Sequence, residues 1–248
     1  RLRYADHVRR HCFIGGTLTP AKTAAIWESR ANEIFTAIIG ESARWGDYRR
    51  AAQPFTRDVE WQQERNRLLT TYFPTRTDFL VNLLRQNNLY PDTDAPDFSP
   101  HGGGFPAGSQ VTIDAPAGTI YFTTDGSDPR EQWTGNAVGT QYAGALTLSD
   151  SIVLKARVLD GGEWSALTEA TFLVGSLASS SNIVVSEVMY NPTGDDPGNE
   201  FIELTNTSSD PVNLSGVHFD AGIEFSVPIG TTVPPGGFLL ITQFENGT

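Results

Sequence analysis

The sequence is poor in cysteine and has no long apolar run. Cys12 is the one cysteine among 248 residues, which excludes an internal disulfide and a cluster of thiolate metal ligands. We expect its side chain to be small, buried and unreactive, because it stands among apolar and basic residues. No stretch of about 18 apolar residues occurs, so the sequence predicts no membrane insertion.

Positive charge is scarce after residue 92. Residues 93–248 contain 3 Lys and Arg against 19 Asp and Glu, whereas residues 1–92 contain 14 against 10. A change this abrupt indicates a domain boundary near residue 92. Phosphate binding needs clustered Lys and Arg, so nucleic acid is not an expected partner of the acidic part.

The first 92 residues have helical periodicity. One helix is expected from Leu2 to Phe13, and Thr19 followed by Pro20 predicts the start of a second.

Two further helices are expected before the boundary. Thr56 should cap the third, which we expect to end at Pro74, and Thr75 with Asp78 forms a capping-box-like start for the fourth. Residues 91–96 are then expected to be a linker.

From residue 97 the apolar period changes to two, which predicts short strands. The clearest alternating segments are Val111–Ile113, Ile120–Phe122 and Ile152–Val158. Asp125–Gly126 and Asp160–Gly162 should form tight turns between strands. Strands without intervening helices favour an antiparallel sandwich.

A second β unit is expected after a flexible linker at Gly175–Asn182. Its expected strands are Ile183–Met189, Phe201–Thr205, Val217–Phe219, Glu224–Val227 and Phe238–Thr242. This segment is short for a sandwich, so one or two strands are expected to be missing.

Residues 1–92 resemble the C-terminal end of the spore coat protein H (CotH-type) atypical kinases. The resemblance is carried by Gly16–Thr19, by the run ESARWGDY at Glu41–Tyr48, by Trp61 and by Phe73–Arg76. It covers only the last helices of that family. The family's nucleotide-binding lysine and metal-binding aspartates lie upstream of these helices, so the resemblance implies no catalytic residue in this chain.

Two further resemblances cover the acidic part. Ile120–Pro129 and Val153–Arg157 are similar to the chitobiase/β-hexosaminidase C-terminal module, an immunoglobulin-like domain. Val185–Val188, Glu200–Asn206 and Leu214–Gly216 are similar to the lamin-tail domain, which is also immunoglobulin-like.

The predicted fold class is therefore multidomain, α plus all-β, with a helical fragment followed by two immunoglobulin-like antiparallel β-sandwiches. The expected domains are residues 1–92 (end of a CotH kinase-like domain), 97–174 (chitobiase-type sandwich) and 183–248 (incomplete lamin-tail sandwich).

Two groupings in the helical part could carry chemistry. Glu41 and Arg44 lie three residues apart, which favours a structural ion pair over an acid–base cluster with Asp47. His7 and His11 have a zinc-like spacing, but no third ligand is identifiable.

In the acidic part, two groups of three residues could supply calcium ligands: Asp114, Asp125 and Asp128, and further on Asp195, Asp196 and Glu200. Neither follows the order of a calcium-binding loop, and Asp125 and Asp128 fit turns better. Trp133, in a polar loop, is the candidate ligand contact through sugar stacking, whereas Trp164 is expected to pack at a core edge. We predict no catalytic residue, no cofactor and no metal site in this chain.

These observations predict a non-catalytic C-terminal region of a secreted or cell-surface bacterial protein, serving as spacer and interaction modules for a kinase-like domain. Two alternatives stay open. The chain could be part of an active ATP-dependent atypical kinase whose catalytic residues lie upstream, or a carbohydrate-binding or surface-attachment module. The expected partners are a cell-surface protein or a polysaccharide.

Overall fold

A computed structural model describes residues 1–193 and 200–242. The chain folds into two compact units. The first contains Arg1–Ala95, Pro116–Gly118 and Arg157–Thr168; the second contains Pro96–Ala115, Thr119–Ala156 and Glu169–Thr248. The predicted fold class is confirmed, because helices occupy the N-terminal part and β-sheets follow. Within the described ranges, every helix is too short or too polar to traverse a bilayer.

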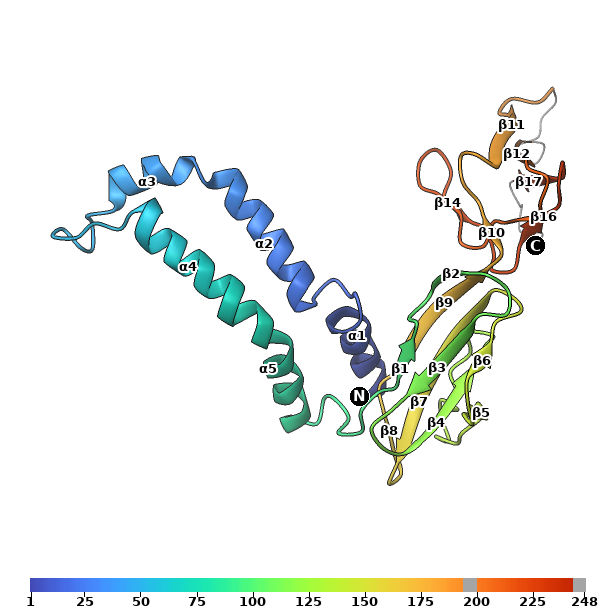
Figure 1. Cartoon of the computed structure of the whole chain (residues 1–248), viewed down its shortest axis with the longest axis horizontal. Coiled ribbons are helices and arrows are strands. Elements are labelled where there is room, and N and C mark those ends of the chain that lie inside the picture. Colours follow the sequence, from blue (N-terminus) through green and yellow to red (C-terminus); the bar gives the residue numbers. More distant parts are fainter. Residues whose placement is uncertain (194–199, 243–248) are drawn as a thin grey trace. The chain divides into compact units, whose positions relative to one another are not determined.

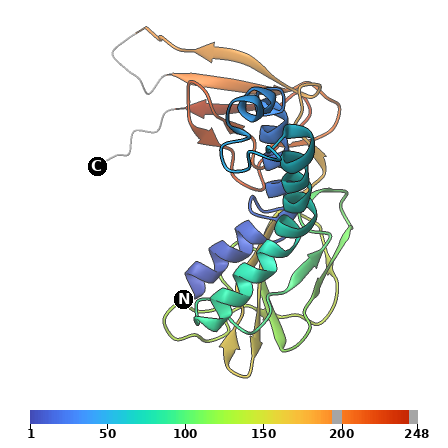
Figure 2. The same cartoon turned by 90° about the vertical axis from the view of Figure 1, so that its left-hand side faces the viewer.

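The helical part forms two antiparallel arms (Figures 1 and 2). Its elements are α1 (Leu2–Cys12), α2 (Pro20–Ile34), α3 (Ala37–Trp45), the π-helical turn η1 (Arg57–Trp61), α4 (Gln62–Arg67), a second π-helical turn η2 (Leu68–Tyr72) and α5 (Phe73–Gln86). The outgoing arm is α2 and α3, and the returning arm runs from η1 to α5.

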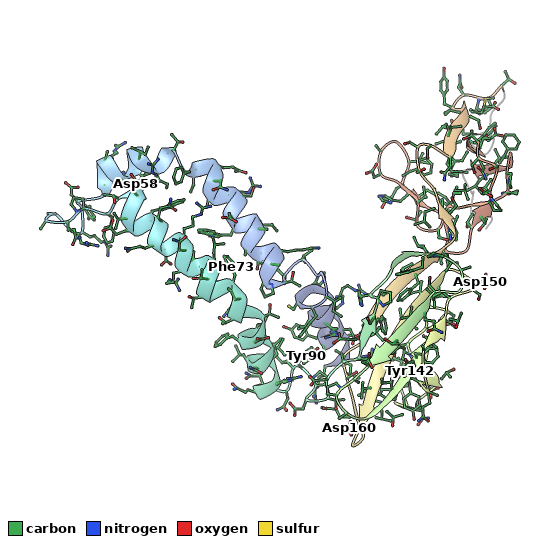
Figure 3. All side chains as sticks on the ribbon, viewed as in Figure 1. Asp58, Phe73, Tyr90, Tyr142, Asp150 and Asp160 are labelled. Atoms are coloured by element: carbon green, nitrogen blue, oxygen red, sulfur yellow. The ribbon has the colours of Figure 1, made fainter. Side chains whose placement is uncertain are left out.

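Aromatic pairs join the two arms. The Phe73 ring, which points towards α2 in Figure 3, lies 6.2 Å from that of Trp27. The rings of Phe35 and Trp61 lie 5.6 Å apart nearer the tip. Offset or tilted rings at these distances are favourable, so the pairs set the register of the arms.

The expected break at Pro74 is wrong, since the helix continues from η2 into α5. The π-helical turn just before Pro74 has longer hydrogen-bonded rings, which make room for the proline ring. The Thr75 hydroxyl donates to the carbonyl of Thr71 at 2.8 Å. The expected capping box with Asp78 is therefore also wrong, because Thr75 lies inside the helix.

Thr19 precedes α2 as predicted, with extended backbone and Pro20 in the first turn. Its hydroxyl donates back to the carbonyl of Gly16 at 2.9 Å instead of capping α2. Thr56 likewise precedes the returning arm, and its N–H donates to a carboxylate oxygen of Glu60 at 2.8 Å.

One apolar core holds the base of the helical part together. Its buried members are Ala5, Val8, Cys12, Val81, Leu84, Tyr90, Ala95 and Ala166. Cys12 is buried as predicted, and burial raises the pKa of its thiol. Burial also raises the pKa of Tyr90 to about 12. The segment expected to be a linker takes part in this packing through Ala95. Pro91 and Pro96 are also fully buried.

The first sandwich is built from two sheets. A six-stranded sheet has the order β2-β9-β7-β4-β5, with β8 also paired to β7, and a three-stranded sheet has the order β1-β3-β6. The strands are β1 (Asp97–Ser99), β2 (Gly103–Phe105), β3 (Gln110–Asp114), β4 (Thr119–Thr123), β5 (Thr140–Gln141), β6 (Leu146–Thr147), β7 (Ile152–Asp160), β8 (Glu163–Trp164) and β9 (Thr168–Val174). The pairing of β2 with β9 is parallel.

The alternating residues of the predicted strands form its core. The buried cluster comprises Phe98, Val111, Ile113, Leu148, Leu154, Ala156, Ala170 and Phe172. The turn at Asp160–Gly162 is confirmed, because β7 and β8 pair through Asp160 and Glu163. Gly161 and Gly162 have φ values of +53° and +89°, a conformation that glycine adopts most easily.

The second module contains three small sheets. Their orders are β10-β13-β16, β11-β12-β17 and β14-β15. The strands are β10 (Ser176–Leu177), β11 (Ile183–Met189), β12 (Phe201–Asn206), β13 (Val212–Asn213), β14 (His218–Phe219), β15 (Phe225–Ser226), β16 (Thr232–Val233) and β17 (Phe238–Thr242). Two residues of the expected linker form β10, which pairs parallel to β13, so the linker is ordered there.

The core face of the second module is incompletely covered. Leu204 and Ile202 of β12 pack in its core, and their partners across the ladder are Val185 and Val188 of β11. Residues directly opposite in a ladder share a face. Both valines are nevertheless 54% exposed.

Candidate interaction surfaces

Trp133 stands on a hydrogen-bonded loop that connects β4 to β5. A bridge between Arg130 and Ala137 closes the base of the loop. The Glu131 N–H donates to the Asn136 carbonyl at 2.9 Å, and the Glu131 carboxylate accepts from Thr134 and Asn136. These bonds fix the loop from within.

The Trp133 side chain takes no part in this internal bonding. It is 88% exposed, the largest exposure of any large apolar side chain in the described residues. An exposed indole on a braced loop can stack on a flat apolar ligand without ordering the loop first.

The other candidate tryptophan is buried. Trp164 is 7% exposed and pairs with Leu159 across the β7–β8 hairpin. The prediction that it packs at a core edge is confirmed.

The aspartates after β4 act as turn residues. The Ser127 N–H donates to Asp125 at 2.9 Å, and the Arg130 N–H donates to Asp128 at 3.0 Å. Hydrogen bonds from the Ser127 hydroxyl and N–H lower the pKa of Asp125. This confirms the interpretation of both residues as turn formers.

The remaining metal candidates are the histidine pair of α1 and the acidic residues before β12. Among the side chains that the structure describes, no group of three or more His, Cys, Asp or Glu could hold a metal ion. The His7 and His11 rings stack at 6.4 Å, and His11 bonds to the Thr17 hydroxyl at 3.3 Å. Asp195 and Asp196 lie outside the described residues, next to the described Glu200.

The predicted ion pair between Glu41 and Arg44 is wrong. No salt bridge joins these two described residues; the Arg44 guanidinium lies over the Trp45 ring instead, 5.0 Å from its centroid. A cation over an indole face is favourable, because the negative face of the ring attracts it.

The tip of the helical arms is aromatic and basic. Trp45, Tyr48, Arg49 and Phe55 line a cavity of about 470 Å³. Tyr48 is 77% exposed, and Trp45 is 55% exposed. No sequence pattern singled out this cavity, although the run ESARWGDY contains half of its lining.

The second module has an apolar cavity of its own. It has a volume of about 470 Å³ and lies between β11–β12 and the β14–β15 hairpin. Its apolar lining includes Val188, Ile202, Ile223, Phe225 and Ile241. The cavity adjoins the uncovered core face of β11.

The fold and these surfaces define a chain with two immunoglobulin-like modules. Residues 100–169 match the family model of the Chitobiase/beta-hexosaminidase C-terminal domain. Residues 176–248 match that of the Lamin Tail Domain. No curated protein matches the chain. The resemblance of residues 1–92 to CotH-type kinases stays a prediction.

Proposed function

We propose that the chain is a non-catalytic C-terminal region of a secreted or cell-surface bacterial protein, in which two immunoglobulin-like modules serve a CotH kinase-like domain as spacer and interaction modules. The match to two such modules carries the proposal. The proposed domains are residues 1–92, 97–174 and 183–248, with no cofactor bound by any of them.

Exposed apolar side chains on the helices support a kinase-like lobe as their neighbour. Large apolar side chains at least 49% exposed on α2, α3 and α5 are Ile26, Ile34, Ile39, Trp45 and Phe79. α2 buries only Ala31, and α3 buries no residue. Helices with so little buried surface are stable only against a further partner.

The test compares this chain with a longer protein that includes the preceding sequence. We expect this chain to bind a hydrophobic dye and the longer protein to bind much less of it. In this chain, Ile34→Ser with Phe79→Ser should lower dye binding, whereas Val138→Ser, a 60% exposed control in the first module, should not. Equal dye binding by both proteins would contradict the proposal.

The alternative of an active atypical kinase concerns the same longer protein. If it is correct, the longer protein transfers phosphate from ATP with a divalent cation, and the present chain does not. A longer protein that lacks phosphate transfer but binds little dye would support a kinase-like domain without kinase activity.

A second candidate function is polysaccharide binding through Trp133. Its 88% exposure on an internally braced loop favours this role. We expect the chain to be retained on one or more insoluble polysaccharides and Trp133→Ala to reduce retention at least about tenfold, because stacking on an aromatic ring supplies much of such binding. Tyr190→Ala is the matched control. No retention across a panel of polysaccharides would end this candidate.

A further inference from the structure

The hairpin end of the first module contains a buried cation. Only three of residues 93–248 are Lys or Arg, and one of these is Arg157 in β7. Its side chain is 3% exposed. An arginine inside a small sandwich is costly unless a partner neutralises it and accepts its hydrogen bonds.

The partner of Arg157 comes from the first helix. The two terminal nitrogens of Arg157 donate to the two carboxylate oxygens of Asp6 in α1, each at 2.8 Å. One of them also donates to the Ser165 carbonyl at 2.9 Å. The Asp6 carboxylate in turn accepts from the Leu167 N–H at 2.8 Å. This bidentate pairing is the strongest arrangement that arginine and a carboxylate form.

Apolar and polar contacts surround this pair. Ala166 is fully buried in the core formed with α1 and α5. Arg9 donates to the Thr168 hydroxyl at 3.2 Å in a buried position. Residues on both sides of the pair are therefore part of the same packed unit.

A second carboxylate, that of Glu163, binds the segment that follows α5. Glu163 accepts from Arg1 at 2.6 Å, from the N–H groups of Asp92 and Thr93 at 3.0 and 2.9 Å, and from the Thr93 hydroxyl at 3.0 Å. The two sites, Asp6–Arg157 and Glu163, use opposite charge arrangements. Both join the N-terminal part, residues 1–95, to Arg157–Thr168.

We propose that Arg157–Thr168, the hairpin end of the chitobiase-type module, is an intramolecular docking site for α1, and that Asp6 and Arg157 specify this docking. This docking site rests on the proposed function, because it treats the module as an interaction module. It adds that the partner of the module is the helical part of the same chain. The module then stabilises the helices as well as spacing them.

The test measures hydrogen exchange of the whole chain, peptide by peptide. Arg157→Met should raise exchange in α1 at least about tenfold, because it leaves Asp6 without its partner. The matched control is Lys155→Met on the same strand, whose ammonium pairs with Glu169 of the neighbouring strand β9. The control should leave α1 unchanged.

Asp6→Asn provides a second variant that leaves the module's own sequence intact. It should raise exchange in α1 and leave β3 and β12 protected. Exchange in α1 that is unchanged in Asp6→Asn, or that rises equally in α1 and β3, would overturn the proposal. Phosphate transfer and dye binding by the longer protein are separate readouts, so failure of the docking site leaves the kinase-domain proposal standing.

Discussion

The helical arms and the first sandwich bury very different numbers of side chains. Of the residues of α2, only Ala31 is buried, whereas β7 buries Leu154, Ala156, Arg157 and Val158. A central strand has neighbours on both edges and a facing sheet, but each helix of a two-arm hairpin has one neighbour. The sandwich therefore buries most of its core between its own two sheets, with α1 neutralising Arg157, whereas the arms are buried mainly at their base.

The largest expected difference concerns two phenylalanines. Phe172 in β9 is fully buried against Phe98 and Phe105, and Phe79 in α5 is 58% exposed. Phe172→Ala should lower the free energy of unfolding by about 3–5 kcal/mol. Phe79→Ala should lower it by less than about 1 kcal/mol. Denaturant titration followed by circular dichroism measures both, and similar losses would show that the arms are packed as tightly as the sandwich.

A second pair of substitutions compares a buried and an exposed leucine within α5. Leu84 is 7% exposed in the core at the base of the arms, and its neighbour Leu83 is 44% exposed. Leu84→Ala should cost about 2–3 kcal/mol, and Leu83→Ala should cost about 0.5 kcal/mol. The midpoint of helix unfolding in urea measures both. If Leu83→Ala were the more damaging change, the base would not be what stabilises the arms.

The smallest expected effect is a pH dependence from Glu163. Burial would raise its pKa, but the hydrogen bonds from Thr93 and Arg1 outweigh burial and lower it below the ordinary 4.5. A carboxyl with a lowered pKa in the folded state stabilises the fold above its unfolded pKa, and this contribution is lost as pH falls through the folded pKa.

Glu163→Gln should therefore lower the melting temperature near pH 7 and have a diminishing effect below about pH 4.5. Glu169→Gln is the control, because Glu169 pairs with Lys155 within the same sheet. A constant difference between the native protein and Glu163→Gln at every pH would show that charge at Glu163 is not responsible.

Periodicity predicted the elements with one buried face. The alternation around Val111 and Leu154 and the spacing around Val8 correspond to β3, β7 and α1. Periodicity missed β10, β13 and β16, because a strand of two residues is too short to show a repeated alternation. It also placed a helix end at Pro74, since the sequence does not show the π-helical turn that accommodates this proline.

Site residues were less predictable than the fold. The exposure of Trp133 followed from its polar loop, and Trp164 was correctly placed in a core. The pair of Asp6 and Arg157 was not found, because its members are 151 residues apart and their pairing depends on tertiary structure. The sequence signal was weak, because Arg157 occupies a polar position in the alternation of β7 and is one of only three Lys or Arg residues after residue 92.

The burial of Cys12 has a consequence for the reactivity of its thiol. A lone accessible thiol in an oxidising medium would couple to other molecules or be oxidised, and it reacts as the thiolate. The raised pKa keeps this sulfur protonated, and its place between α1 and α5 shields it from reagents. Alkylation of Cys12 in the folded chain therefore requires α1 to detach. The rate of alkylation reports how often α1 detaches, without any added label.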